Sequence, residues 1–217
     1  DEALSIRIFD QYLKALDPEK LFFTQVDIDQ LSEARTRLGA DMLNDDLARP
    51  FAIFNLYVKR ANERFGYARG LLKDGFNFET NETLQFARKK QAWAKNEAEV
   101  QDLWRKRVKN DWLRLKLAGK DDKGIVEVLG KRYDSSLKRM ARLNNEDAFT
   151  TYMNAYAAAI EPHTAYMAPR AAENFNISMR LSLSGIGAVL TESGEYTTIR
   201  ELVPASPASQ SGQLNVG

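Results

Sequence analysis

Residues 96–119 read NEAEVQDLWRKRVKNDWLRLKLAG, and this stretch decides the class of fold. Asn96 followed by Glu99 is typical of a capping box, in which each side chain bonds a free backbone amide at the start of a helix. The apolar residues that follow recur at helical spacing and form one stripe, made of Val100, Leu103, Trp104, Val108, Trp112 and Leu115. Gly119 then ends the pattern. The stretch predicts a long helix that buries both tryptophans in a core.

The sequence on either side repeats the helical pattern. Before the stretch, the first helix is predicted for Ala3–Leu16. A second begins at Thr24, which caps amides near Asp27, and carries Ile28, Leu31, Leu38 and Leu43. A third is predicted for Phe51–Lys73, with Pro50 in its first turn and Asp74-Gly75 at its end. After it, helices are predicted for Ile125–Leu143 and Ala148–Ile160. Six helices with short polar joints predict a mainly α protein, with an irregular multi-helix N-terminal domain over residues 1–178.

The composition is that of an ordinary globular protein. The chain has 217 residues, of which 44% are hydrophobic and 28% charged, and this suits one or two domains with a sizeable core. The absence of cysteine excludes disulfides and thiolate metal sites, and we expect no metal and no cofactor. No apolar run reaches the roughly 18 residues of a membrane helix, so we expect no stable membrane span. Residues 1–16 are amphipathic and do not form a signal peptide, which in a secreted parent would have to precede them.

Lysine and arginine are concentrated between Gln101 and Arg142, with thirteen of them against six acidic residues. The formal net charge of the whole chain is only +1, so any attraction to nucleic acid would have to come from this stretch. A solvated helix face explains the pattern without a ligand. Binding of nucleic acid would also need aromatic rings that are free to stack on bases, whereas Trp104 and Trp112 belong to the apolar stripe. We therefore expect no nucleic acid partner.

Candidate catalytic residues are few in this sequence. His163 is the only histidine, so a histidine metal cluster is excluded, and its place after Pro162 at a helix end suggests a structural bond to a terminal carbonyl. Ser135, Ser136 and Lys138 could form a Ser-Lys pair, but they lie in a charged amphipathic helix that offers nothing to desolvate the lysine. The sequence predicts no catalytic residue within this chain.

The pattern changes near Met179, where the helical period gives way to alternation. Residues 179–217 read MRLSLSGIGAVLTESGEYTTIRELVPASPASQSGQLNVG. One strand is predicted to include Leu181, Leu183, Ile186, Ala188 and Leu190. A turn over Glu192–Glu195 leads to a second strand, Tyr196–Leu202, and a short helix follows within Pro204–Gly212. Two strands after six helices predict the start of a second domain, which we assign to residues 179–217.

The segment SGIGAVL, residues 184–190, is the candidate binding site of this second domain. Gly185 and Gly187 flank Ile186 and leave successive N–H groups unshielded, which makes a nest for an anion such as a carboxylate. An extended peptide could then lie along the strand that follows as an added strand. We therefore expect Gly185, Ile186, Gly187, Ala188, Val189 and Leu190 to bind a peptide C-terminus. A simple bulge or tight turn is the alternative.

The order of these features resembles a known family. A Gly-x-Gly loop, strand, turn, strand and "SPA" helix resemble the first half of a PDZ domain. IEPHTAYMAP (160–169) followed by FNISMRLSLSGIGAVL (175–190) is similar to the stretch that leads into the PDZ domain of carboxyl-terminal processing proteases. LDPEKLFFTQVDID (16–29) and WAKNEAEVQDLWRKRVKNDWLRLKLAGK (93–120) resemble the N-terminal domain of the tail-specific branch of that family.

The resemblance implies a function that the residues alone do not give. Members are periplasmic serine endopeptidases that recognise apolar C-terminal tails of substrate proteins through the PDZ domain, and some act with an adaptor lipoprotein. They cleave with a Ser-Lys dyad in a later α/β domain, which is not in this chain, so we expect the chain alone to be inactive. The small Ala188 implies that Ile186 and Leu190 line the pocket for the terminal side chain. Glu161 stands where the family often has Asp, and either residue can accept a bond at a helix terminus. The alternative is a non-enzymatic peptide-binding or adaptor module.

Overall fold

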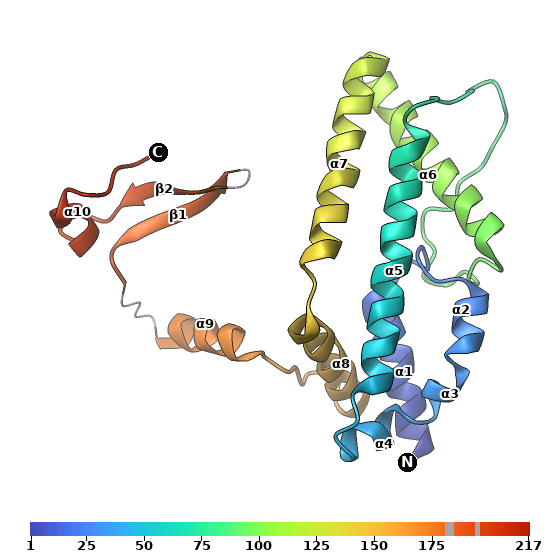
Figure 1. The fold of residues 1–217 in the computed structure, drawn as a ribbon, viewed down its shortest axis with the longest axis horizontal. Coiled ribbons are helices and arrows are strands. Elements are labelled where there is room, and N and C mark those ends of the chain that lie inside the picture. The colour runs from blue at the N-terminus through green and yellow to red at the C-terminus, as the bar shows by residue number, and fades with distance from the viewer. Residues whose placement is uncertain (181–184, 194–195) are drawn as a thin grey trace. The chain divides into compact units, whose positions relative to one another are not determined.

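The computed structural model describes residues 1–180, 185–193 and 196–217 of the chain (Figure 1). It forms two compact units, Asp1–Tyr166 and Met167–Gly217. Most of the chain is helical, and its one sheet has two antiparallel strands in the second unit, which confirms the mainly α class with a small β part. The predicted domain boundary after residue 178 stays a prediction.

Eight helices build the first unit. They are α1 (Glu2–Leu16), α2 (Gln25–Gln30), α3 (Ser32–Arg35), α4 (Leu38–Leu43), α5 (Ala48–Leu71), α6 (Glu97–Leu117), α7 (Asp122–Arg142) and α8 (Asn145–Ile160). Helix α6 begins at the predicted cap: the Asn96 side chain accepts a hydrogen bond from the Glu99 amide, and Gly119, with φ +88°, follows the end of the helix. The Glu99 carboxylate accepts from the Lys95 amide at 2.7 Å, not from the Asn96 amide of the predicted capping box. Helices α7 and α8 begin at side-chain caps that were not predicted, and α5 has no side-chain cap. Local signals therefore fix where α6 begins and ends.

The second predicted helix is wrong as a single element. Thr24 caps α2 through a capping box with Asp27, as expected, but the segment then breaks into α2, α3 and α4. The reason is tertiary: the Gly39 amide donates to Ser5 Oγ at 3.0 Å, and the Leu38 carbonyl accepts from the Tyr152 hydroxyl at 2.6 Å. These bonds to other helices hold α4 against α1 and α8, which a straight helix could not satisfy.

Two clusters of buried residues form the core of the first unit. One joins α1, α4 and α8 with the first half of α5, and its members include Ile8, Tyr12, Leu38, Ile53 and Tyr152. The other joins α6 and α7 with the second half of α5, and its members include Ala68, Trp104, Val108, Trp112 and Leu129. The burial of both predicted tryptophans is confirmed. Because α5 contributes to both clusters, it is the central helix of the unit (Figure 1).

A long connection without helix or strand joins α5 to α6. It follows the end of α5 at Leu71, two residues before the predicted end, passes Gly75, whose φ is +67°, and returns to the core at Ala94. There the Ala94 carbonyl accepts from the Gln25 amide at 2.8 Å, in a parallel bridge beside Thr24. Ion pairs of Glu82 with Arg105 and Lys109 fasten its middle to α6. A backbone bridge therefore holds the end of this connection, and side-chain ion pairs hold its middle.

The second unit contains α9 (Pro169–Arg180), β1 (Ala188–Ser193), β2 (Tyr196–Leu202) and α10 (Pro207–Ser211). The second strand was predicted with these bounds, and the short helix lies within its predicted range. The predicted change of period near Met179 is wrong at that point, because α9 continues to Arg180. The amphipathic pattern of α9 was not recognised as a helix, and no residue of it is buried. The predicted strand residues Leu181 and Leu183, and the turn residues Gly194 and Glu195, lie outside the described residues.

Candidate peptide-binding loop

The six predicted binding residues lie together at the start of the sheet. Gly185, Ile186 and Gly187 precede β1, and Ala188, Val189 and Leu190 are its first three residues. Ile186 and Leu190 are each 57% exposed, so an apolar side chain is accessible in the loop and another in the strand that follows it.

Hydrogen bonds to the region of α10 set the orientation of the loop backbone. The Ile186 carbonyl accepts from the Ala208 amide at 2.9 Å, and the Gly187 carbonyl accepts from the Val203 amide at 2.8 Å. The Ser206 hydroxyl also donates to the Gly187 carbonyl, at 3.3 Å. These bonds use the carbonyls of the loop and hold them toward the rest of the unit.

The amide groups of the same loop are left free. Within residues 1–180, 185–193 and 196–217, no acceptor receives a hydrogen bond from the amides of Gly185, Ile186 or Gly187. Successive unpaired N–H groups on a glycine-containing loop are suited to hold an anion. The loop amides could donate to a carboxylate, and the predicted binding of a peptide C-terminus stays a prediction.

The two glycines of the loop have different roles. Gly187 has φ +80°, and a Cβ atom there would lie 2.1 Å from the Ser206 Cβ, so no other residue fits without rebuilding the contact with α10. Gly185 does not have positive φ, and a Cβ atom there would meet nothing within 4 Å. Gly187 is thus required by the turn itself, which is the part of the pattern that the tight-turn alternative explains.

The edge of β1 gives a second feature for recognition. β1 pairs with β2 in an antiparallel register that runs from Ala188 opposite Leu202 to Ser193 opposite Tyr196, with an irregularity between Val189 and Leu190. Among the described strands β2 is its only neighbour, so the opposite edge of β1 keeps unpaired peptide groups. On β2 the Ile199 carbonyl accepts from the Gly217 amide at 3.0 Å. The free edge therefore lies on the strand that continues from the glycine loop.

The other candidate residues of the sequence have structural partners. The Glu161 carboxylate accepts from the His163 amide at 2.9 Å and from the Thr164 hydroxyl at 2.8 Å, as expected for an acceptor at a helix terminus. The His163 side chain is exposed and, within the described part of the chain, does not make the bond to a terminal carbonyl that we expected. The Ser136 hydroxyl donates to the Arg132 carbonyl of its own helix at 3.1 Å.

The basic stretch of α6 and α7 is largely paired with acids. Lys106 lies 3.0 Å from Asp102, Arg132 lies 2.9 Å from Asp111, and Arg105 pairs with Glu82 and Asp102. The buried Trp104 and Trp112 offer no free ring to a base. These contacts favour a solvated, ion-paired helix face. Among the described residues there is also no group of three or more potential metal ligands.

Sequence reasoning missed a pocket beside α6, which is lined by the end of the long connection. Its residues include Arg88 and Trp93, and its volume is about 840 Å³. The length of the connection could have pointed to it, because loops of more than about 12 to 15 residues without helix or strand are uncommon in compact domains and are often functional.

Comparison with known proteins gives the family. Residues 1–170 match the family described as Tail specific protease N-terminal domain. The whole chain is also similar to a tail-specific protease of Haemophilus influenzae, with 38% identity over 218 residues. The match covers 100% of this chain and 31% of the relative, so the chain spans about a third of the length of that protein. These matches confirm the resemblance seen in the sequence, and the chain belongs to the tail specific protease N-terminal domain family.

Proposed function

We propose that this chain is the N-terminal part of a tail-specific protease and that its loop Gly185–Leu190 receives the C-terminus of the polypeptide to be cut. The observation that carries the proposal is that the carbonyl groups and the amide groups of the loop differ in their hydrogen bonding. Its carbonyls at Ile186 and Gly187 are bonded internally, while the amides from Gly185 to Gly187 have no described acceptor. The name of the Haemophilus influenzae relative supports the same activity for a longer protein.

Binding would use the loop and the strand together. The terminal carboxylate accepts hydrogen bonds from the loop amides, which are stronger than neutral ones because the acceptor is charged. The residues before it add a strand to the free edge of β1, and the last side chain packs against Ile186 and Leu190. A PDZ-like site of this kind selects an apolar tail because it pairs one anion site with an apolar surface.

The proposal assigns cutting to another part of the parent protein. From the family resemblance, that step belongs to a serine endopeptidase that acts in the periplasm with a Ser-Lys dyad in a later α/β domain. In the described residues, no helix is long and apolar enough to cross a membrane. We expect the present chain to bind tails without cleaving them. Fragments from an unfolded protein incubated with the repurified chain would contradict this expectation.

The experiment that tests the loop compares Ile186→Asp with Ile186→Asn in the full-length protease. Both variants remove the same apolar contact at an exposed position, but only aspartate adds a negative charge beside the carboxylate. Calorimetry with a free-acid tail peptide should show a further loss of about 1 kcal/mol for Ile186→Asp, the energy of two like charges about 4 Å apart in water. An amidated peptide should bind weakly and equally to both variants.

The outcome also separates the alternatives. Equal affinity for acid and amidated peptides in the unaltered protein would show that the loop is only a tight turn. Tail binding without any cleavage by the full-length protein would favour a peptide-binding module instead of a protease.

A further inference from the structure

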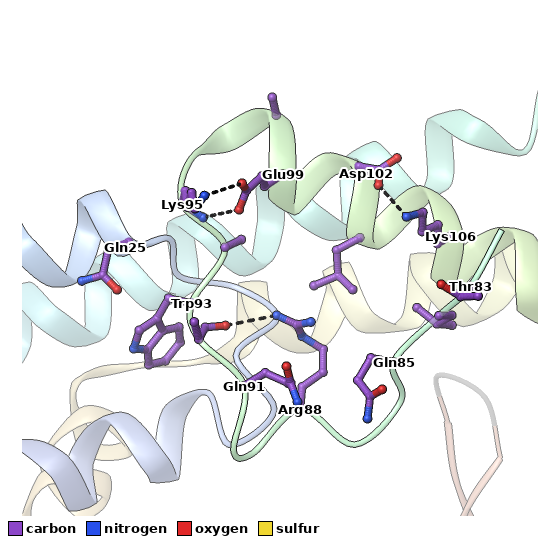
Figure 2. Close-up of a pocket in the computed structure, with 15 residues that line it drawn as sticks. Gln25, Thr83, Gln85, Arg88, Gln91, Trp93, Lys95, Glu99, Asp102 and Lys106 are labelled. Atoms are coloured by element: carbon purple, nitrogen blue, oxygen red, sulfur yellow. Dashed lines mark hydrogen bonds and ion pairs between the residues drawn. The ribbon is translucent and has the colours of Figure 1, made fainter.

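The pocket beside α6 is a hollow of the first unit that no part of the proposed function uses. We name it the α6 pocket; it is lined by residues 83–85, by Arg88, by residues 91–95, and by Gln25 and five residues of α6. Figure 2 shows the connection passing along α6 with the Arg88 side chain pointing toward that helix. Trp93, Leu84 and Leu103 give the pocket an apolar wall, and Gln25, Gln85 and Gln91 give it amide groups. Its volume of about 840 Å³ is enough for several residues of a peptide.

The backbone at the edge of this pocket has unused hydrogen-bonding groups. Residues 81–87 contain no helix, strand, turn or bend, and none of their amides donates a hydrogen bond to another of the described residues. They are nevertheless fixed at both ends, by the pairing of Glu82 with Arg105 and by a bond of 2.8 Å from the Arg88 amide to Glu19 Oε2. A fixed, unpaired backbone segment can pair with another extended chain, as the edge of a sheet does.

The pocket also continues along α6 beyond the residues shown. A smaller hollow of about 280 Å³ shares Thr83, Leu84 and Lys106 with it. This hollow is lined by Phe86 and Leu113, which are 56% and 37% exposed. The two hollows therefore adjoin, and both offer apolar side chains near the segment 81–87, which suits the side chains of an extended peptide.

Arg88 is the one cation lining the α6 pocket that lacks an acidic partner among the described residues. Lys95 and Lys106, the other two, lie 4.0 Å from Glu99 and 3.0 Å from Asp102. Within the described part of the chain, the Arg88 guanidinium makes one hydrogen bond, from Nη2 to the Ala92 carbonyl at 3.3 Å, and its buried Nε has no acceptor. Burial and the nearby Arg107 lower its pKa, although Asp17 and Glu19 attract the charge from farther away. A charge in this state is stabilised by an anion that enters the pocket.

We propose that the α6 pocket binds the C-terminal segment of an extended polypeptide, with the terminal carboxylate on Arg88, the backbone on residues 81–87 and an apolar side chain on Trp93. The proposal rests on the proposed function in taking a polypeptide tail as the ligand, and it adds a second binding site in the helical unit. A tail fits better than an acidic peptide, because Glu99 and Asp102 line the same pocket and would repel further carboxylates.

The test uses the 217-residue chain and three ten-residue peptides with the same apolar sequence. One peptide ends in a free carboxylate, one is amidated, and one is amidated and carries an internal aspartate. Calorimetry should show that the free acid binds about tenfold or more tightly than both amidated peptides, the range for a hydrogen bond to a charged group. If the amidated aspartate peptide bound as tightly as the free acid, the ligand would not be a terminal carboxylate. If no peptide showed saturable binding, the α6 pocket would not be a peptide-binding site.

Two variants test whether the peptide binds at the α6 pocket. Ala98→Glu puts a carboxylate on an exposed residue that lines the pocket, near the start of α6, where an acidic residue favours the helix. It should reduce the affinity for the free acid about tenfold, as should Arg88→Gln. Ala141→Glu, at an exposed position of α7 away from the pocket, is the matched control and should change nothing. Melting curves verify that each variant is folded, and normal binding by Ala98→Glu would overturn the proposal.

The same peptides distinguish this site from the loop Gly185–Leu190. Ile186→Asp should leave binding at the α6 pocket unchanged, whereas a loss of all binding in that variant would assign the tail to the loop alone. If the pocket variants lose affinity while Ile186→Asp does not, the α6 pocket stands even where the loop proposal fails.

Discussion

The two compact units of this chain differ in how much they bury. The first unit holds two clusters of buried side chains that share α5, and its helices α6, α7 and α8 start at side-chain caps. In the described part of the second unit, Ala208 is the only buried hydrophobic residue and Ser206 the only buried polar one. Apolar side chains at Ile186 and Leu190 remain exposed there. The difference teaches that the first unit carries its own stability, while the second presents surface for contacts.

The largest expected effect is in hydrogen exchange. Amides in the middle of α6 should exchange only through global unfolding of the first unit, because Trp104 and Val108 anchor the helix in the core. Amides of β1 and β2 should open with free energies lower by about 3 kcal/mol or more, since a two-stranded sheet is only marginally stable. Exchange measured by mass spectrometry on the whole chain checks this. Similar protection in both units would break the comparison.

Trp104→Ala should lower the free energy of unfolding of the first unit by about 3 to 5 kcal/mol, as for other buried aromatic residues. The side chain is 5% exposed, and its Nε1 donates to the Leu21 carbonyl at 2.7 Å, so the variant leaves both a cavity and an unpaired carbonyl. Urea denaturation followed by circular dichroism measures the change. Leu117→Ala, at a position of α6 that is 78% exposed, is the control and should cost less than about 0.5 kcal/mol.

Asp27→Asn should lower the stability of the first unit at pH 7 by about 1 to 3 kcal/mol, the range for hydrogen bonds to a charged group. Asp27 is fully buried, and burial alone would raise its pKa, but bonds from Arg60 and Thr24 outweigh burial and hold the pKa below its usual value. A carboxylate whose pKa is lower in the folded state stabilises the folded protein at pH values above the unfolded-state pKa of about 3.9. That stabilisation is lost as the pH falls through the folded-state pKa.

Unfolding measured from pH 7 down to pH 3 checks the sign of this effect. The difference between the unaltered protein and Asp27→Asn should be constant down to about pH 4 and then shrink. A difference that grows on acidification would mean that Asp27 is protonated in the folded unit.

The smallest expected effects come from the helix caps. Asn96→Ala should destabilise the first unit by about 1 kcal/mol, because the side chain no longer accepts from the Glu99 amide. Ser206→Ala removes both the cap of α10 and the bond to the Gly187 carbonyl, so it should increase exchange in β1 and β2 only. A shift of the unfolding midpoint of the first unit by Ser206→Ala would show that the units are not independent.

The sequence predicted a helix or strand correctly where the capping residue or the hydrophobic pattern that defines it lies within that helix or strand or directly beside it. The cap at Asn96 and the apolar stripe after it gave α6, and alternation gave the bounds of β2. The break of the second helix could not be predicted, since it depends on bonds to distant residues: the Gly39 amide donates to Ser5, and the Tyr152 hydroxyl donates to Leu38. The helix α9 was missed because its apolar residues were assigned to the strand pattern that follows Met179.

The candidate sites show the same limit. The glycine spacing predicted a loop with free amides, but the close approach of Ser206 that makes Gly187 indispensable comes from α10. For the α6 pocket, Arg88 is one of many basic residues in the sequence. Only the folded arrangement shows that its neighbours Lys95 and Lys106 have acidic partners and that Arg88 does not.

The packing of α1 against α8 has a consequence for synthesis of the chain. Arg7 Nε bonds the Ala159 carbonyl at 3.2 Å, and the Tyr12 and Tyr152 rings lie 5.6 Å apart, so the first helix completes its core only with the last helix of the unit. At a translation rate of about 5 to 20 residues per second, α1 emerges roughly 7 to 30 s before α8. During that interval its apolar face, including Ile8 and Phe9, is available to chaperones or to neighbouring nascent chains. Slower elongation in the middle of the message should therefore increase aggregation of this protein.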